Sequence, residues 1–241
     1  MNANTKTQIT KTPAGIYTVS WRYEQASLDI QVGSFASDGL KVVSPSQLAF
    51  AQTNAGNGTF ERYSRTTGDC LYDARNNKFV IFPDGTIRDL VGIANIVDAH
   101  RQGKEYVIPT TSQRDRIYAI ADEMLRKGTA VAVNPGTTNV DTSNFGEVEL
   151  TDRLYSNKGI GFKAEDYGKF LRDEKRRKVQ SFFLDSEDYA KSQKEPYVNG
   201  LRVYGPEYDF DVFGFVRFLV DYYGAFGVRF EKAAKGGRPK K

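Results

Sequence analysis

A cluster of basic residues in the second half of the chain offers the clearest chemistry, which is the binding of phosphate groups. Between Lys158 and Lys178, eight lysines and arginines stand against four acidic residues, so this segment has a net charge of +4. Tyr155, Phe162 and Tyr167 are interleaved with the cations, a composition typical of surfaces on which single-stranded bases stack. We therefore expect a basic and aromatic surface that binds nucleic acid. Its predicted contact residues are Lys158, Phe162, Lys163, Arg172, Lys175 and Arg176.

The stretch Lys158-Gly-Ile-Gly-Phe-Lys163 resembles the first ribonucleoprotein motif of RNA-recognition domains. In that motif a strand with the pattern basic-Gly-aromatic-Gly-aromatic stacks bases on its aromatic side chains. The lysine, the two glycines and Phe162 match, whereas Ile160 and Glu165 stand where stacking aromatics are expected. The alternative is a glycine-rich turn that enters a helix at about residue 164, where backbone N–H groups can approach a phosphate.

The last ten residues, 232–241, form a second cationic element with five basic and no acidic residues. The whole chain of 241 residues has a formal charge of +4, so the other 231 residues sum to −1 and a generally basic, histone-like protein is excluded. The Gly-Arg-Pro core of this element resembles an AT-hook, although Gly236 stands where the first arginine of that motif is expected. We expect a disordered tail that adds phosphate contacts, with a merely solubilising terminus as the alternative. The predicted contact residues of the tail are Lys235, Arg238, Lys240 and Lys241.

Three acidic residues allow a different interpretation, a Mg²⁺-dependent nuclease. Glu207, Asp209 and Asp211 alternate, so on a strand all three carboxylates would project from one face and could hold a metal ion. Asp209 and Asp211 would instead cap a helix if one begins there, and this is the interpretation that we favour. His100 and Cys70, the only residues of their types, suit structural roles in a helix and a strand. No catalytic residue, metal ligand or cofactor is therefore predicted.

Aromatic residues suggest a third possibility, a self-assembling structural protein such as a virion or sheath component. Eleven Tyr and Phe residues lie within Tyr197–Phe230, which is more than one buried helix needs. Because aromatic residues are enriched at protein interfaces, we expect a possible homo-oligomer. The predicted partners are thus nucleic acid, either single- or double-stranded, and further copies of the chain.

The elements that must position these residues predict an α+β fold. Alternating apolar residues over Ile16–Glu24, and again from Leu28 to Val32, predict an antiparallel, aromatic-rich N-terminal sheet. Residues 79–133 then read strand–helix–strand–helix–strand, and the second of these helices is closed by Gly128. The next segment, 134–163, has the composition of a long irregular region.

Two further helices are predicted in the C-terminal half, at about 164–183 and over 209–224. The chain is expected to divide into a flexible arm over 1–13, a single compact α+β domain over 14–230 and the disordered basic tail over 231–241. No apolar run is long enough to span a membrane and the polar N-terminus lacks a signal peptide, so we expect no membrane partner and a cytoplasmic or otherwise intracellular location.

Overall fold

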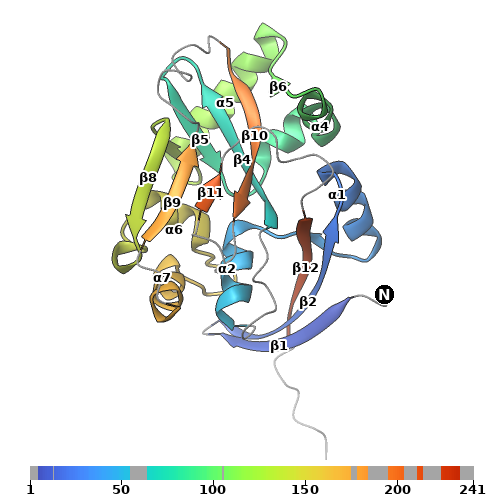
Figure 1. Ribbon diagram of the computed structural model, residues 1–241, viewed down its shortest axis with the longest axis vertical. Helices are drawn as coiled ribbons and strands as arrows, with labels where there is room; N and C mark the ends of the chain where they lie inside the picture. The colour runs from blue at the N-terminus through green and yellow to red at the C-terminus, as the bar shows by residue number, and fades with distance from the viewer. Residues whose placement is uncertain are drawn as a thin grey trace, which may run out of the picture.

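The computed structural model describes residues 5–12, 14–54, 64–104, 106–174, 178–183, 195–203, 211–213 and 224–233. Within these ranges the chain has the predicted α+β fold, a single compact domain in which helices cover a mixed β-sheet (Figure 1). Elements, contacts and cavities are described for these residues alone.

All the described strands belong to one sheet, and most neighbouring strands run antiparallel. The order is β1-β2-β12-β4-β10-β11-β9-β8, with β3 beside β12, β5 between β4 and β7, and β6 beside β10. The sheet is mixed because β12 runs parallel to β4 and β11 runs parallel to β9. The strands are β1 Lys6–Thr12, β2 Gly15–Gln25, β3 Lys41–Val42, β4 Ser64–Asp73, β5 Lys78–Phe82, β6 Tyr106–Val107, β7 Val131–Val133, β8 Gly136–Asp141, β9 Lys178–Phe183, β10 Tyr197–Val203, β11 Asp211–Phe213 and β12 Gly224–Lys232.

Two groups of helices pack through two separate apolar clusters, one on each face of the central strands. Helices α1, α3, α4 and α5 contribute to one cluster, and α2, α6 and α7 contribute to the other. The helices are α1 Leu28–Ser37, α2 Pro45–Asn54, α3 Thr86–Val91, α4 Ile93–Arg101, α5 Thr111–Lys127, the short 3₁₀ helix η1 Thr142–Asn144, α6 Glu149–Tyr155 and α7 Ala164–Asp173.

Strand β5 has four consecutive apolar residues, Phe79–Phe82, instead of alternating apolar and polar residues. Phe79 and Ile81 pack into the cluster with α2, α6 and α7, whereas Val80 and Phe82 pack into the cluster on the opposite face. A strand that is covered on both faces buries every side chain, so both of its faces must be apolar. The helices on both sides of this strand can therefore place residues around its end, where the site described below lies.

The first correction to the sequence prediction concerns residues 28–32, which belong to helix α1 and not to a strand. The buried residues of α1 are Leu28, Gln31 and Phe35, a spacing of three and four that matches a helix. Ile30 instead is 54% exposed. The alternation of apolar residues at positions 28, 30 and 32 is thus incidental, because tertiary packing selects the helical face.

The second correction concerns the segment from 134 to 183. The region predicted to be irregular contains β8, the helical turn η1 and α6. The helix predicted over 164–183 ends at Asp173, and residues 178–183 form β9, which pairs with both β8 and β11. These pairings satisfy the backbone hydrogen bonds of 178–183 with strands that are distant in sequence, which local patterns do not reveal.

Two further predictions differ from the observed elements. Residues 6–12, placed in a flexible arm, form β1, which pairs with β2 from Lys6↔Trp21 to Thr12↔Gly15. The backbone of this segment is therefore held by a sheet ladder. The helix predicted over 209–224 is also wrong where it is described, since residues 211–213 form β11 and residue 224 begins β12.

No helix in the described part of the chain has both the length and the apolar character that crossing a bilayer requires.

Candidate functional site

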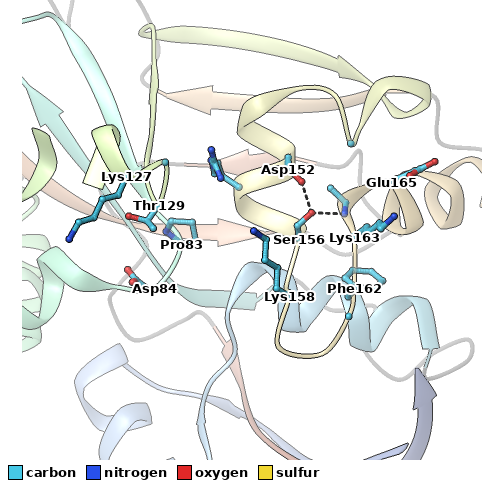
Figure 2. Close-up of a pocket in the computed structure, with 15 residues that line it drawn as sticks. Pro83, Asp84, Lys127, Thr129, Asp152, Ser156, Lys158, Phe162, Lys163 and Glu165 are labelled. Carbon is cyan, nitrogen blue, oxygen red and sulfur yellow. Dashed lines mark hydrogen bonds between the residues drawn. The ribbon is translucent and has the colours of Figure 1, made fainter. Parts of the chain in front are cut away.

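A cavity of about 820 Å³ lies where the β5–α3 turn, the C-terminal end of α5 and the α6–α7 segment meet (Figure 2). Pro83 and Asp84 come from the turn, and Lys127 and Thr129 come from the end of α5. The α6–α7 segment forms the opposite wall. The polar and charged side chains from this segment that line the cavity include Asp152, Arg153, Ser156, Lys158, Lys163 and Glu165.

A buried ion pair between Asp69 of β4 and Arg88 of α3 anchors the β5–α3 turn. The backbone N–H of Arg88 donates to Asp69 Oδ2 at 2.7 Å, and its guanidinium Nε lies 3.4 Å from Asp69 Oδ1. The hydroxyl of Thr67 donates to the carbonyl oxygen of Pro83 at 3.0 Å. Burial raises the pKa of the Asp69 carboxyl to about 7, although the charge of Arg88 opposes this shift. These contacts hold the turn, and with it Asp84, at one side of the cavity.

Helix α5 ends at Gly128 as the sequence predicts, and this end positions two cations. Gly128 has a φ of 66°, the left-handed conformation that glycine adopts at low cost. A Cβ at this position would lie 2.6 Å from a guanidinium nitrogen of Arg153, so the arginine packs closely over the glycine. Lys127, one residue earlier, forms an ion pair with Glu123. Arg153 therefore packs against the end of α5, whereas Lys127 is paired with Glu123.

The loop between α6 and α7 is closed by hydrogen bonds at its base. Asn157 and Phe162 exchange two backbone hydrogen bonds, at 2.7 and 3.0 Å. The hydroxyl of Ser156 donates to Asp152 Oδ1 at 2.6 Å and accepts the N–H of Ala164 at 2.9 Å, as the dashed lines in Figure 2 show. The loop that carries Lys158 is thus held in one conformation, and the start of α7 is tied to the end of α6.

A hydrogen bond from the neighbouring sheet supports the same loop. The hydroxyl of Tyr17 in β2 donates to the carbonyl oxygen of Gly159 at 3.0 Å. Gly161 has a φ of 65° and lies so close to Ala14 that a Cβ there would be 2.9 Å from the alanine Cβ. The two glycines of the motif therefore serve a tight turn. The predicted alternative, a glycine-rich turn that leads into a helix at residue 164, is the one observed.

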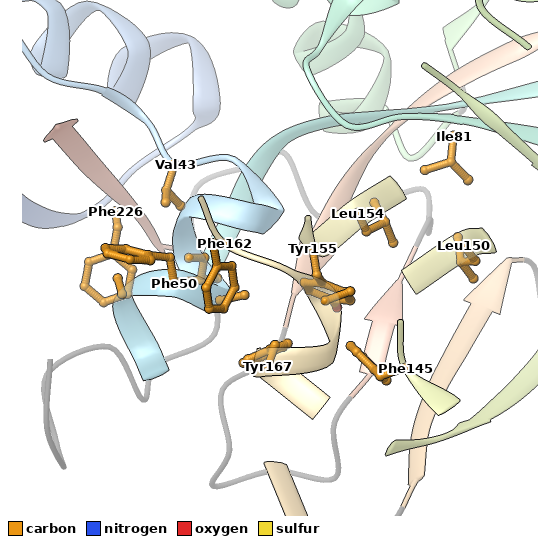
Figure 3. Packing of buried hydrophobic residues seen from close by; sticks show 14 of the residues in the cluster. Val43, Phe50, Ile81, Phe145, Leu150, Leu154, Tyr155, Phe162, Tyr167 and Phe226 are labelled. Atoms are coloured by element: carbon orange, nitrogen blue, oxygen red, sulfur yellow. The ribbon is translucent and has the colours of Figure 1, made fainter. Parts of the chain in front are cut away.

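The prediction that Phe162 stacks bases is contradicted by its burial. Its side chain is only 6% exposed and meets Phe50 edge to face, with ring centroids 5.5 Å apart. Figure 3 shows the ring packed between Phe50 and Tyr155 in the core. Tyr155 and Tyr167, the other two aromatic residues of the predicted surface, are buried as well. The aromatic half of that surface is therefore core, because these side chains fill the space between α2, α6 and α7.

The predicted cations separate into three groups. Lys158 and Lys163 both line the cavity and are exposed. Arg172 lies in the last turn of α7, where its guanidinium donates to the carbonyl oxygen of Thr142, and it does not line the cavity. The remaining predicted contact residues lie outside the described residues; they are Lys175, Arg176, Lys235, Arg238, Lys240 and Lys241.

Two cavity cations, Lys127 and Arg153, were missed by the sequence reasoning. Lys127 directly precedes Gly128, which the sequence predicts as the end of a helix. The position of Lys127 in the last turn of that helix could therefore have been predicted. Arg153 lies in α6, within the region predicted to be irregular. Its placement depends on the contact with Gly128, which no local pattern reveals.

The described residues that line the cavity carry mixed charges, with four cations against three carboxylates. Asp84 Oδ1 accepts hydrogen bonds from the N–H and the hydroxyl of Thr86, so this carboxylate is engaged in the turn just before α3. Asp152 holds Ser156, as described above. In the part of the chain that the structure describes, Arg153, Lys158 and Lys163 form no ion pair with a carboxylate. These three cations are therefore available for an external anion.

The other candidate residues do not form a second site in the described ranges. Glu207 and Asp209 lie outside the described residues, and Asp211 begins β11. The described residues contain no group of three or more potential metal ligands. Cys70 and His100 are buried, and burial raises the pKa of the Cys70 thiol well above its usual value, which disfavours the reactive thiolate.

No protein-family model, curated protein or solved structure matches this chain. The cavity itself presents ammonium and guanidinium groups, which attract anions. Its rim also carries hydroxyl groups, and Phe162 is its one aromatic lining residue among those described. The chemistry that this arrangement supports is the binding of phosphate oxygens by cations, without base stacking.

Proposed function

We propose that this protein is a non-enzymatic accessory protein that binds nucleic acid through its phosphate groups. The observation that supports the proposal is that Lys158 and Lys163, predicted from charge alone, line one cavity together with Arg153. Because the neighbouring aromatic residues are buried, the contacts are made to the backbone and carry little sequence preference.

The basic tail adds to this binding in the proposed mode. A deletion that begins at residue 231 would remove two residues of β12, since Glu231 and Lys232 pair with Thr18 and Tyr17 of β2. A truncation after Ala233 keeps the strand and still removes the cations Lys235, Arg238, Lys240 and Lys241. If each of these four contacts one phosphate, the slope of log K against log salt becomes shallower by about 3 to 4 units.

The proposal is tested by fluorescence anisotropy with labelled single-stranded and duplex DNA and RNA over a range of salt concentrations. Lys158→Ala and Lys163→Ala should each weaken binding and reduce the salt slope by about one unit, as expected for the loss of one phosphate contact. Lys104→Ala is the matched control, because Lys104 is also exposed but does not line the cavity. Equal effects of all three substitutions, or no binding at low salt, would refute the proposal.

Self-assembly is a second candidate, and the edge of the sheet favours it. In the described residues, β1 pairs with β2 only and stands at the end of the strand order. Ile9 on this strand is 72% exposed, and Ile16 on β2, next to it on the same outer face, is 46% exposed. Exposed apolar edge strands tend to pair with further strands.

A second copy of the chain is the partner that we propose for this edge. Light scattering of the purified protein should then show defined oligomers. Ile9→Lys, which places a charge on the edge, should shift them towards monomer without lowering the thermal stability. A wild-type protein that stays monomeric at high concentration would rule this candidate out.

A further inference from the structure

The cavity has the size of a small-ligand site, which is more than a patch of surface lysines needs. Its volume of about 820 Å³ falls in the range of about 300 to 1,000 Å³ that is typical of pockets for small molecules. Its walls come from three separate parts of the chain, each anchored by the contacts described above. A preformed hollow of this kind can accept one compact group into its interior.

The signs of the lining charges argue against a long strand lying across the cavity. A phosphate backbone that crossed it would pass Asp84 on one wall and approach Asp152 and Glu165 on the other. Each of these carboxylates would repel a phosphate of the same sign. Figure 2 shows Lys158 between Asp84 on one side and Lys163 on the other. The interior is therefore suited to a single anionic group.

The cations that can meet such a group are Arg153 and Lys158. Arg153 is held over Gly128 and presents a planar guanidinium, the group best suited to bind two phosphate oxygens at once. Lys158 is carried by the hydrogen-bonded loop between α6 and α7. Neither has an acidic partner among the described residues. Two unpaired cations match a phosphomonoester, which carries a charge of about −1.5 to −2 at neutral pH, better than an internal phosphodiester with its single charge.

From these observations we propose that the cavity takes a phosphomonoester, presented as the terminal phosphate of a nucleic-acid strand. The inference rests on the proposed function, since it adds the part of the nucleic acid that the cavity recognises. Arg153 and Lys158 hold the terminal phosphate, and the following nucleotides leave the cavity past Lys163.

The test compares two fluorescent oligonucleotides of the same sequence, one with a 5′-phosphate and one with a 5′-hydroxyl, and repeats the pair with a 3′-phosphate. The phosphorylated strand should bind about tenfold or more tightly, as expected for charge-assisted hydrogen bonds to one added group. Arg153→Ala and Lys158→Ala should abolish the difference between the two strands, and Lys104→Ala should preserve it. Arg153→Lys, which keeps the charge, should restore part of the preference and shows that loss in the alanine variant is not caused by misfolding.

Each outcome separates the inference from the proposed function. Equal binding of the phosphorylated and unphosphorylated strands refutes the phosphomonoester site and leaves nucleic-acid binding intact. Absence of binding by every oligonucleotide refutes the proposed function. Adenosine monophosphate and inorganic phosphate serve as competitors. If one of these small molecules binds as tightly as the phosphorylated strand and displaces it, the cavity is a phosphomonoester site. That result would refute the proposal that the cavity recognises the end of a nucleic-acid strand.

Discussion

Substituting Phe162 distinguishes a core residue from a nucleic-acid contact. Its side chain is 94% buried, being 6% exposed, and it lies against Phe50. Removing a buried phenylalanine side chain forfeits about 1.5 to 3 kcal/mol of transfer free energy. The cavity that remains adds to this loss, so Phe162→Ala should lower the free energy of unfolding by about 3 to 5 kcal/mol. Phe162→Leu, which retains most of the volume, should cost less than about 1.5 kcal/mol.

Urea unfolding followed by the fluorescence of the single tryptophan, Trp21, measures both changes, because this residue is buried in the same apolar cluster. Nucleic-acid affinity is measured on the same proteins by anisotropy at a temperature where each is folded. Phe162→Leu should bind as tightly as the wild type, since the ring makes no stacking contact. If the ring did stack a base, its loss would weaken binding by about 1 to 3 kcal/mol. Unchanged stability together with weakened binding would refute the assignment of Phe162 to the core.

Three further substitutions test other parts of the structure. Because the pKa of Asp69 is raised to about 7, the folded protein binds the proton of this carboxyl more tightly than the unfolded chain does. Between about pH 4 and 7 the free energy of unfolding should therefore fall by up to about 1.4 kcal/mol for each unit by which the pH rises. Asp69→Asn should remove this contribution in urea titrations at pH 5 and 7, and an unchanged pH dependence would contradict it. Arg75→Ala removes a guanidinium that lies 3.7 Å from the ring of Tyr118 and forms ion pairs with the buried Asp73 and with Asp122. Because the Asp73 carboxylate would lose its charged hydrogen-bond partner, the substitution should lower the free energy of unfolding by about 1.5 to 3 kcal/mol; a loss below about 0.5 kcal/mol in urea unfolding would show that solvent screens these contacts. Gly168→Ala would place a Cβ 2.6 Å from the Cβ of Phe145 and should destabilise by about 1 to 3 kcal/mol despite the better helix propensity of alanine, whereas a higher melting temperature would disprove this close packing.

Local signals predicted the elements whose packing agrees with their sequence pattern. Helix α5 is the clearest example, because its apolar positions repeat at helical spacing and Gly128 supplies the left-handed residue that ends it. The α+β class followed from the same kind of pattern. Helix α1 shows the limit, since positions 28, 30 and 32 alternate like a strand while the buried residues follow a helical spacing.

Long-range pairing decided the elements that were predicted wrongly. Residues 178–183 continue the apolar pattern of α7, yet they form a strand because β8 and β11 lie on either side of them. The site shows the same division. Charge alone identified Lys158 and Lys163, but Arg153 joins them only through its contact with α5, and the burial of Phe162 depends on α2. The sequence thus indicated two of the cations that line the cavity, whereas the aromatic residues beside them are buried in the core.

The position of β12 in the sheet has a consequence for the order in which the chain can fold. This strand, at residues 224–232, lies between β2 and β4, and nine of its residues pair with β2. During synthesis, the β1–β2 hairpin therefore has no link through β12 to the rest of the sheet until the ribosome has released residue 232. Contacts across about 200 residues close slowly because of their loop entropy. The growing chain must therefore keep the edge of β2 that faces β12 unpaired during that time, and an unpaired strand edge of this kind is prone to associate with other chains.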